Sequence, residues 1–426
     1  AVVEIAEALE SGLEAKHITW IPGTCVKGSL EDADEDTVIL PSYDEIAGDK
    51  DKYGESFAMQ YRNNDAISGK RMMEPYGKTQ CVIQNPPQPP LERVELDAVY
   101  ELPYEGDYHP VYEKDGGVPA IKEVKFSLVS SRGCFGGCAF CTISAHQGKF
   151  IVNRSEESIL REIKEIAKMD DFKGYLSDLG GPSANMYAMK GRDQELCGKC
   201  KRPSCIHPRI CPNLNADPRP LLDIYKAVDA LPGIKKSFIG SGVRYDMLLH
   251  DYKDAEINKA NQRYIRELIV NHVSGRLKVA PEHTSDAVLQ VMRKPTFSQF
   301  IQFKRIFDDI CRKERLNQQI IPYFISSHPG CREADMAELA IETKKLDFHL
   351  EQVQDFTPTP MTVSTVTWAT GFHPYTMEPL YSAKNPTEKQ NQRMFFFWYK
   401  PEEKKRIMQR LRQMGRMDLA DRLFKK

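Results

Sequence analysis

Apolar residues follow two repeating patterns along the chain. Near its start, Val2, Ile5, Ala6, Leu9 and Leu13 recur at the spacing of one helix face, which predicts an amphipathic helix. From "VKFSLVSS" onward, short apolar runs alternate with amphipathic stretches of helix length. Alternation of strands and helices is typical of a parallel sheet with right-handed crossovers, so we predict an α/β fold. The further strand-like runs are "GYLSD", "KSFIG", "RLKVA", "QIIPYFISS" and "EQVQDF".

The number of these units predicts the architecture. Six fall short of the eight that close a (β/α)8 barrel, so we expect a partial, open (β/α)6 TIM-like barrel of parallel strands. One helix should lie in "SEESILREIKEIAK", because Ser155 can cap its N-terminus and Ile159, Ile163 and Ile166 share one face.

Changes in composition divide the chain into four regions. We predict a partial, truncated α/β N-terminal region over 1–90, and a linker over 91–120 that follows the polyproline run "QNPPQPP". The barrel should occupy 121–375 with a cysteine-rich insertion at 190–216, followed by a C-terminal extension over 376–426 that ends in a basic helix. Because the chain begins on Ala1 inside a helical pattern, we expect it to be a fragment.

Composition bounds the environment of the protein. The formal net charge is -1, which by itself indicates neither nucleic acid nor membrane binding. No apolar run approaches the ~18 residues of a spanning helix, so we predict a cytoplasmic protein with no membrane partner. Seven of the eleven cysteines fall in two tight clusters, which favours metal ligation in a reducing compartment over disulfides.

The first cluster is "RGCFGGCAFC", which places Cys134, Cys138 and Cys141 directly after the first strand of the predicted barrel. In parallel βα folds, sites lie at the carboxyl ends of the strands. A closed zinc site and an iron-sulfur cube both require four ligands. Three cysteines would leave one position of the metal group open to another molecule, and a zinc loop or a chance cluster is the alternative.

This segment resembles the cysteine triplet of radical S-adenosylmethionine (SAM) enzymes, including the aromatic Phe140 before the third cysteine. The flanking runs are similar to the YgiQ-type (UPF0313) branch of that superfamily, over about residues 80 to 400. The resemblance implies a 4Fe-4S cluster that binds SAM, and a one-electron donor such as flavodoxin or ferredoxin. Reductive cleavage of SAM would give a 5'-deoxyadenosyl radical that abstracts hydrogen from an unknown substrate. The sequence shows no Asp-x-His-x-x-Gly signature for cobalamin.

The resemblance also implies residues for SAM. Gly180 and Gly181 match a Gly-Gly-Glu motif, but Pro182 replaces its acid, which leaves Asp178 or Ser183 as substitutes.

Two charged residues complete this predicted set. Arg244 would pair with the SAM carboxylate and Glu282 with the ribose hydroxyls. A surface arginine, and a glutamate at the start of a helix capped by Thr284, are the alternatives.

Other polar residues follow the last two strands or stand alone. His328 and Cys331 could face substrate, although packing roles are the more common outcome at such positions. Isolated cysteines in apolar context predict buried structural thiols, namely Cys25, Cys81 and Cys311.

The second cluster, "CGKCKRPSCIHPRIC", predicts a second metal site. Four thiols at Cys197, Cys200, Cys205 and Cys211 can close a tetrahedral shell, with His207 as a spare ligand. Zinc is slightly favoured over iron-sulfur, and a loop of free thiols is the alternative.

The end of the chain suggests a competing function. Ten Lys or Arg against four Asp or Glu give residues 400–426 a net charge of +6 above the apolar face of Ile407, Leu411 and Met414. That helix could bind RNA or an acidic protein partner. The alternative function is therefore a non-catalytic zinc or iron-sulfur protein that binds nucleic acid through its basic tail.

Overall fold

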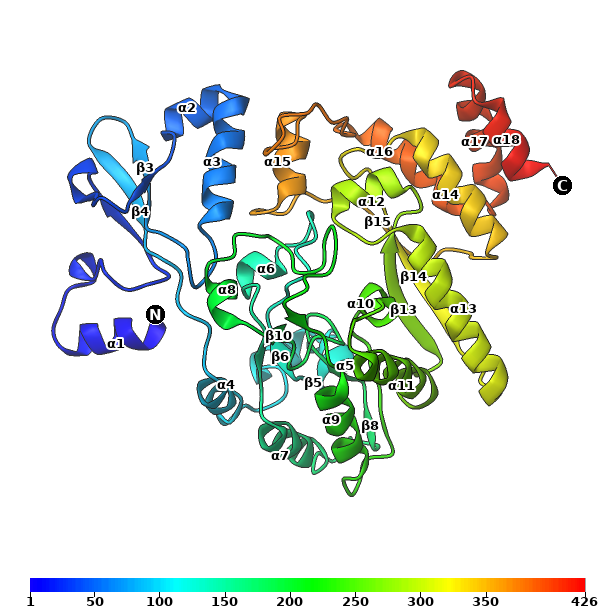
Figure 1. Ribbon diagram of the computed structural model, residues 1–426, viewed down its shortest axis with the longest axis horizontal. Helices are drawn as coiled ribbons and strands as arrows, with labels where there is room; N and C mark the ends of the chain where they lie inside the picture. The colour runs from blue at the N-terminus through cyan, green and yellow to red at the C-terminus, as the bar shows by residue number, and fades with distance from the viewer. Residues whose placement is uncertain (426) are drawn as a thin grey trace.

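The N-terminal region is built on a mixed sheet. The computed structural model describes residues 1–425, and its first sheet has the order β1-β4-β3-β2, in which only β2 and β3 run parallel (Figure 1). Residues on one face of this sheet, Met73, Cys81 and Ile83, form its small core. The strands are β1 (Cys25–Gly28), β2 (Val38–Ile39), β3 (Met72–Tyr76) and β4 (Gln80–Gln84), and the helices are α1 (Val2–Glu10), α2 (Tyr43–Gly48) and α3 (Lys50–Arg62).

All six predicted barrel strands are present, and all their mutual pairings are parallel. One segment carries β8 (Tyr175–Leu176) and β9 (Asp178–Gly180); β9 pairs with β5 (Ser127–Val129) and β8 with β12 (Lys236–Ser237). The second group is β13 (Arg276–Glu282), β14 (Gln319–Ser326) and β15 (Gln352–Asp355), with β14 in the middle.

The two groups do not form one continuous sheet, and residues 1–425 contain no closed barrel. Beyond β12, the Ile239 amide donates to the His272 carbonyl at 2.9 Å rather than to β13. The α/β class is therefore confirmed, whereas the continuous six-stranded barrel is not.

Amphipathic helices cover these strands and bury one large core. In α7 (Glu156–Ile166) the Ser155 hydroxyl accepts from the Ser158 amide at 3.0 Å, and the predicted isoleucine face is buried. The other long helices around the strands are α9 (Arg219–Asp229), α11 (Ala255–Asn271), α13 (Phe297–Glu314) and α14 (Glu333–Lys345) (Figure 1).

Short elements surround the predicted site. Strands β10 (Lys190–Gly191) and β11 (Leu214–Asn215) pair antiparallel and so close off the cysteine-rich insertion. Strands β6 (Ser131–Arg132) and β7 (Val152–Asn153) do the same for the first cysteine loop. The remaining helices before the tail are α4 (Arg93–Tyr100), α5 (Ile121–Val124), α6 (Ile143–His146), α8 (Gln194–Gly198), α10 (Tyr245–Leu249), α12 (Asp286–Met292), α15 (Val363–Thr370) and α16 (Pro386–Arg393), with 3-10 turns at Ala15–His17, Leu30–Asp32, Pro110–Asp115 and Met394–Phe397.

The basic tail packs against the body as α17 (Pro401–Gln413) and α18 (Met417–Phe424). Ile407 and Leu411 are fully buried, as the apolar face predicts. Arg410 pairs with Glu333 of α14 at 2.6 Å, and Arg422 pairs with Glu338 of the same helix at 2.5 Å. Much of the tail's charge is thus already engaged. Among the described helices, none has the length and apolar character needed to span a membrane.

Candidate active site

The first cysteine loop is fixed by backbone hydrogen bonds from several elements. The Cys134 amide donates to the Gly148 carbonyl at 3.0 Å, and the Ala139 amide to the Met292 carbonyl at 2.9 Å. Gly137 has a φ of +59°, and a side chain there would overlap the Pro203 carbonyl of the cysteine-rich insertion. The sequence therefore places glycine where the loop turns left-handed against a neighbouring backbone.

Burial raises the pKa of two of the three thiols. It raises the pKa of Cys134 to about 11, and the neighbouring Cys138 adds to that shift. The pKa of Cys141 is also raised by burial. The Arg244 Nη1 atom lies 3.7 Å from the Cys138 sulfur. A guanidinium beside buried thiols favours the thiolate forms that a metal cluster needs.

Arg244 lies beside this loop but is already paired. Its Nε and Nη2 atoms donate to both carboxylate oxygens of Asp246, at 2.9 and 2.6 Å. Asn185 holds the arginine backbone from both sides, since its amide oxygen accepts from the Arg244 amide and its nitrogen donates to the Arg244 carbonyl. The alternative of a surface arginine is wrong, because Arg244 is buried. One edge of its guanidinium faces the cysteines and the other faces Asp246.

Glu282 is buried at the end of β13 with a φ of +69°. Its Oε1 atom accepts from the Lys294 ammonium at 3.4 Å, whereas Oε2 has no hydrogen-bond partner in the described part of the chain. Burial raises the pKa of the carboxyl group, and Lys294 only partly offsets this. Glu282 also affects the pKa of Cys141, so the two lie near each other. Thr284 is not the cap of the following helix, because Ser285 holds that position.

Gly180 is the last residue of β9, and Gly181 follows it directly. A side chain at Gly180 would meet Asp178 and Ser241, and one at Gly181 would meet the Ser131 hydroxyl. Asp178 accepts from the Gly240 amide at 2.8 Å and from both the amide and the hydroxyl of Ser241. This carboxylate therefore joins β9 to the loop after β12. Ser183 is buried close by.

His328 and Cys331 follow β14 in the sequence, and both are buried. Phe140 stands edge to face with His328, with ring centroids 6.0 Å apart. His328 is fully buried and bonded to the Pro329 carbonyl and the Ser364 hydroxyl. Cys331 is also buried and lies 3.4 Å from His283 Nε2. His328 and Cys331 are thus both in contact with other buried residues, as a packing role requires.

The second cysteine cluster is compact and adjoins the first. Burial and the other three thiols raise the pKa of Cys205 to about 11. The Asn213 amide nitrogen donates to the Cys197 sulfur at 3.2 Å. The Cys205 amide donates to the Phe135 carbonyl at 3.0 Å, which ties the insertion to the first loop. Burial lowers the pKa of His207 to about 4, which leaves its ring neutral.

Neither cluster is preformed as a metal site. Within residues 1–425, no group of three or more His, Cys, Asp or Glu side chains is arranged to hold a metal ion. The donor chemistry nevertheless suits the implied groups, because the thiols are gathered on short loops and Glu282 keeps a buried oxygen free for a ligand. Nothing in the structure favours zinc over iron-sulfur. Of the three isolated cysteines, Cys81 and Cys311 are buried as predicted, but Cys25 is exposed on edge strand β1, so that prediction is wrong.

Sequence reasoning missed several residues of this site. Asp246 and Lys294 hold the two predicted charged residues, and Asn185 holds the Arg244 backbone. Asp246 could have been found from its spacing, since it stands two residues after Arg244 at the start of α10. Lys294 gives no such signal, because only the fold brings it to Glu282.

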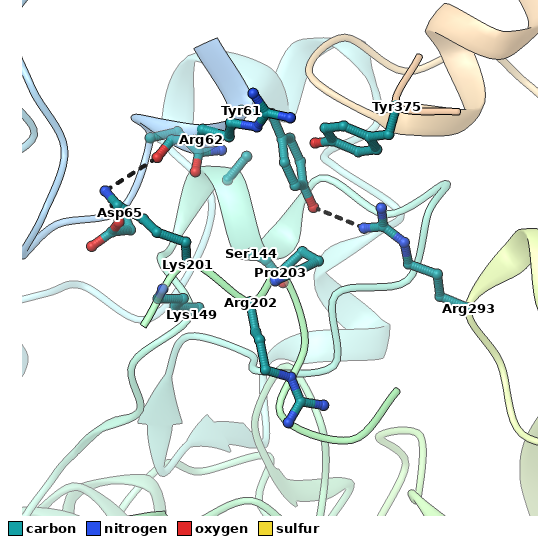
Figure 2. A pocket seen from close by; sticks show the side chains of 12 residues that line it. Tyr61, Arg62, Asp65, Ser144, Lys149, Lys201, Arg202, Pro203, Arg293 and Tyr375 are labelled. Atoms are coloured by element: carbon teal, nitrogen blue, oxygen red, sulfur yellow. Dashed lines mark hydrogen bonds and ion pairs between the residues drawn. The ribbon is translucent and has the colours of Figure 1, made fainter. Parts of the chain in front are cut away.

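Two cavities flank α6, which directly follows the cysteine loop. The larger has a volume of about 860 Å³ and lies between α6, the polyproline segment and α4. The smaller has a volume of about 230 Å³ and is shown in Figure 2, where basic side chains and two tyrosines surround it. Both lie between the N-terminal region and the parallel strands.

Comparison with known proteins defines the class and the family. Residues 1–127 match the model described as Radical SAM N-terminal, and residues 351–422 match a domain of unknown function, DUF3362. A UPF0313 protein of Bacteroides thetaiotaomicron is 60% identical, over 99% of this chain and 69% of the relative. Another, from Porphyromonas gingivalis, is 54% identical, over 99% of this chain and 67% of the relative. The chain belongs to the UPF0313 family of radical SAM enzymes. It spans about two thirds of the length of these two relatives.

Solved structures are only distantly similar. The radical SAM methyltransferase TsrM from Kitasatospora setae, with cobalamin and a 4Fe-4S cluster bound, gives a TM-score of 0.34 at 12% identity, over 57% of this chain and 39% of that one. The cobalamin-dependent radical SAM enzyme OxsB gives a TM-score of 0.36 at 16% identity, over 65% of this chain and 35% of that one.

Proposed function

We propose that this protein cleaves SAM reductively, with Cys134, Cys138 and Cys141 holding a 4Fe-4S cluster. The observation that carries the proposal is the convergence of three partly buried thiols with Arg244 and with the unpartnered oxygen of Glu282. When bound, the cluster and SAM would supply one-electron cleavage to a 5'-deoxyadenosyl radical for hydrogen abstraction from substrate. We further propose that the two groups of parallel strands together serve as the incomplete barrel around this site.

The residues of the chain would orient and shield the cofactors. Arg244 lies between Asp246 and Cys138, so it offsets thiolate charge while Asp246 keeps it in place. Glu282 can accept hydrogen bonds from vicinal ribose hydroxyls through the oxygen that Lys294 leaves free. Gly180 and Gly181 lack side chains where Asp178, Ser241 and Ser131 pack, and their backbone would meet the SAM amine. Phe140 closes the loop against His328 and limits water beside the cysteines.

Spectroscopy tests cofactor binding without requiring turnover. After anaerobic iron and sulfide reconstitution and reduction, the electron paramagnetic resonance spectrum should report one or more reduced 4Fe-4S clusters, and adding SAM should change the signal of one of them. A spectrum identical with and without SAM would contradict the proposal. An external reductant replaces the natural one-electron donor, which we expect to be a flavodoxin or ferredoxin.

We also propose a second metal at Cys197, Cys200, Cys205 and Cys211. The mutual effect of these thiols on the pKa of Cys205 supports it, because only closely placed thiols interact in this way. Metal analysis should give about four irons and one zinc, or about eight irons, per chain. Four irons with no second metal would show that the second cluster is empty. The competing nucleic-acid-binding function is not favoured, because the chain belongs to an enzyme family and its tail arginines pair with α14.

A further inference from the structure

The side chains that line the smaller cavity, of about 230 Å³, carry a net positive charge. Five cationic side chains line it, from α3, the segment after α6, the cysteine-rich insertion and the end of α12 (Figure 2). Asp65 is the one acidic side chain in its lining. The cations are Arg62, Lys149, Lys201, Arg202 and Arg293.

Most of this positive charge is unbalanced within the protein. Lys201 lies 3.7 Å from Asp65. In the chain as described, the other four cations have no carboxylate within 4.0 Å. Like charges gathered around a small cavity repel one another, so an anion inside it would lower the free energy of the site.

Aromatic and backbone contacts hold the guanidinium groups in place. The Arg293 Nη1 atom lies 3.4 Å from the Tyr61 hydroxyl, and its guanidinium stands 5.9 Å from the centre of that ring. Arg62 stands 5.8 Å from the centre of the Tyr375 ring. Arg202 donates to the carbonyls of two insertion residues. The tyrosines therefore position arginines, and the ligand group that this cavity fits is an oxyanion.

The cavity lies against the outer side of the cysteine loop. Ser144 lines the cavity and donates to the Cys134 carbonyl at 2.7 Å. Pro203 also lines it, and the next residue, Ser204, donates to the Gly136 carbonyl at 2.7 Å. Arg293, which lines the cavity, is followed in the sequence by Lys294, the ion-pair partner of Glu282. The cavity is therefore adjacent to the loop that carries the three cysteines.

We propose that this cavity binds a phosphate group of the substrate, so that the substrate class is a phosphorylated metabolite or a nucleic acid. That the bound molecule is the substrate rests on the proposed function, whereas the phosphate site itself does not. Several guanidinium groups around one cavity match the charge and the paired oxygens of a phosphate.

Calorimetric titration of the full, anaerobically reconstituted chain tests the proposal. Inorganic pyrophosphate and a single-stranded RNA 12-mer serve as separate probes. We expect saturable binding of at least one probe, weakened at least about tenfold by Arg293→Gln, which loses a charge-assisted hydrogen bond, and less by Arg202→Gln, because the Arg202 guanidinium is bonded to carbonyls of the insertion. Arg62→Gln should act in the same direction and, because Arg62 is exposed, should not disturb folding. Lys164→Gln, exposed on α7 away from the cavity lining, is the control and should bind like the unmodified chain.

The two probes separate the sources of phosphate. Pyrophosphate binding that matches or exceeds RNA binding supports a phosphorylated metabolite, and tighter RNA binding with strong salt dependence supports a nucleic acid. No saturable binding of either probe, or binding unchanged in all three cavity variants, would overturn the proposal. The titration needs neither SAM nor reductant, so loss of SAM cleavage with intact probe binding would contradict only the proposed function.

Discussion

The backbone conformation and the burial of Glu282 both destabilise the folded protein. A non-glycine residue at a φ of +69° costs about 1–2 kcal/mol. Its carboxyl group is buried with one oxygen unpartnered, and burial raises its pKa above the usual value of 4.5. Because the folded protein holds this proton more tightly than the unfolded chain, stability from the group is fully present below pH 4.5 and is lost as pH rises through the folded pKa. A ligand that donates to the carboxylate would offset that cost.

SAM binding should therefore depend on the ionisation of Glu282. If ribose hydroxyls donate to its carboxylate, affinity should rise as pH increases through the raised pKa and then level off. Glu282→Gln should weaken SAM binding about tenfold or more at neutral pH, as expected for the loss of charge-assisted hydrogen bonds of about 1.5–3 kcal/mol. It should also remove this part of the pH dependence. Equilibrium dialysis of reconstituted protein across a pH series measures both effects, and equal affinities at all pH values would contradict this role.

The backbone of the cysteine loop packs closely against the insertion at Gly137. Gly137→Ala should cost the left-handed strain of about 1–2 kcal/mol and, in addition, push the loop away from Pro203. We expect a larger loss of unfolding free energy than strain alone explains, together with less iron retained per chain. Chemical denaturation and iron analysis measure the two.

A matched control separates strain from overlap. Gly77 has a nearly identical φ of +61° in the turn between β3 and β4, with open space around it. Gly77→Ala should therefore show only the strain cost and keep its iron. Equal effects of the two substitutions would mean that the contact with Pro203 is unimportant.

At the scale of elements, periodicity and run length were sufficient to predict the strands. The isoleucine face of α7, its Ser155 cap and all six strands were predictable because each depends on local sequence. The separation of the strands into two groups could not be predicted from local sequence. It depends on a tertiary hydrogen bond, in which the His272 carbonyl accepts from the Ile239 amide. The cysteines were equally predictable, and Asp246 could have been found from its spacing to Arg244, whereas Lys294 could not, because only the tertiary structure brings it to Glu282.

Tail docking should depend on apolar burial rather than on charge. Leu423 of α18 is 1% exposed, whereas Arg422 and Glu338 are 46% and 39% exposed. Leu423→Ala should lower the free energy of unfolding by about 2–5 kcal/mol, and Arg422→Gln by less than about 1 kcal/mol. Urea denaturation gives both values. A larger effect from the arginine would show that charge holds the tail in place.

On the scale of the whole molecule, the site is assembled from distant segments. Residues 61–65 of the N-terminal region, α6, the insertion and the end of α12 meet around the cavity of Figure 2. No local pattern could reveal this basic cavity, because apart from the adjacent Lys201 and Arg202 its cations are far apart in the sequence. The arrangement makes the N-terminal region part of the proposed site.

The central claim is that three cysteines support reductive SAM cleavage, and product formation tests it most directly. After anaerobic reconstitution and reduction, the unmodified chain should convert SAM to 5'-deoxyadenosine, measured by chromatography. Cys138→Ala should lose the activity and its SAM-responsive cluster, because three thiols are required to leave one iron open. Cys311→Ala, at a buried thiol far along the sequence, is the control and should retain both. Full activity and an intact SAM-responsive cluster in Cys138→Ala would contradict the account.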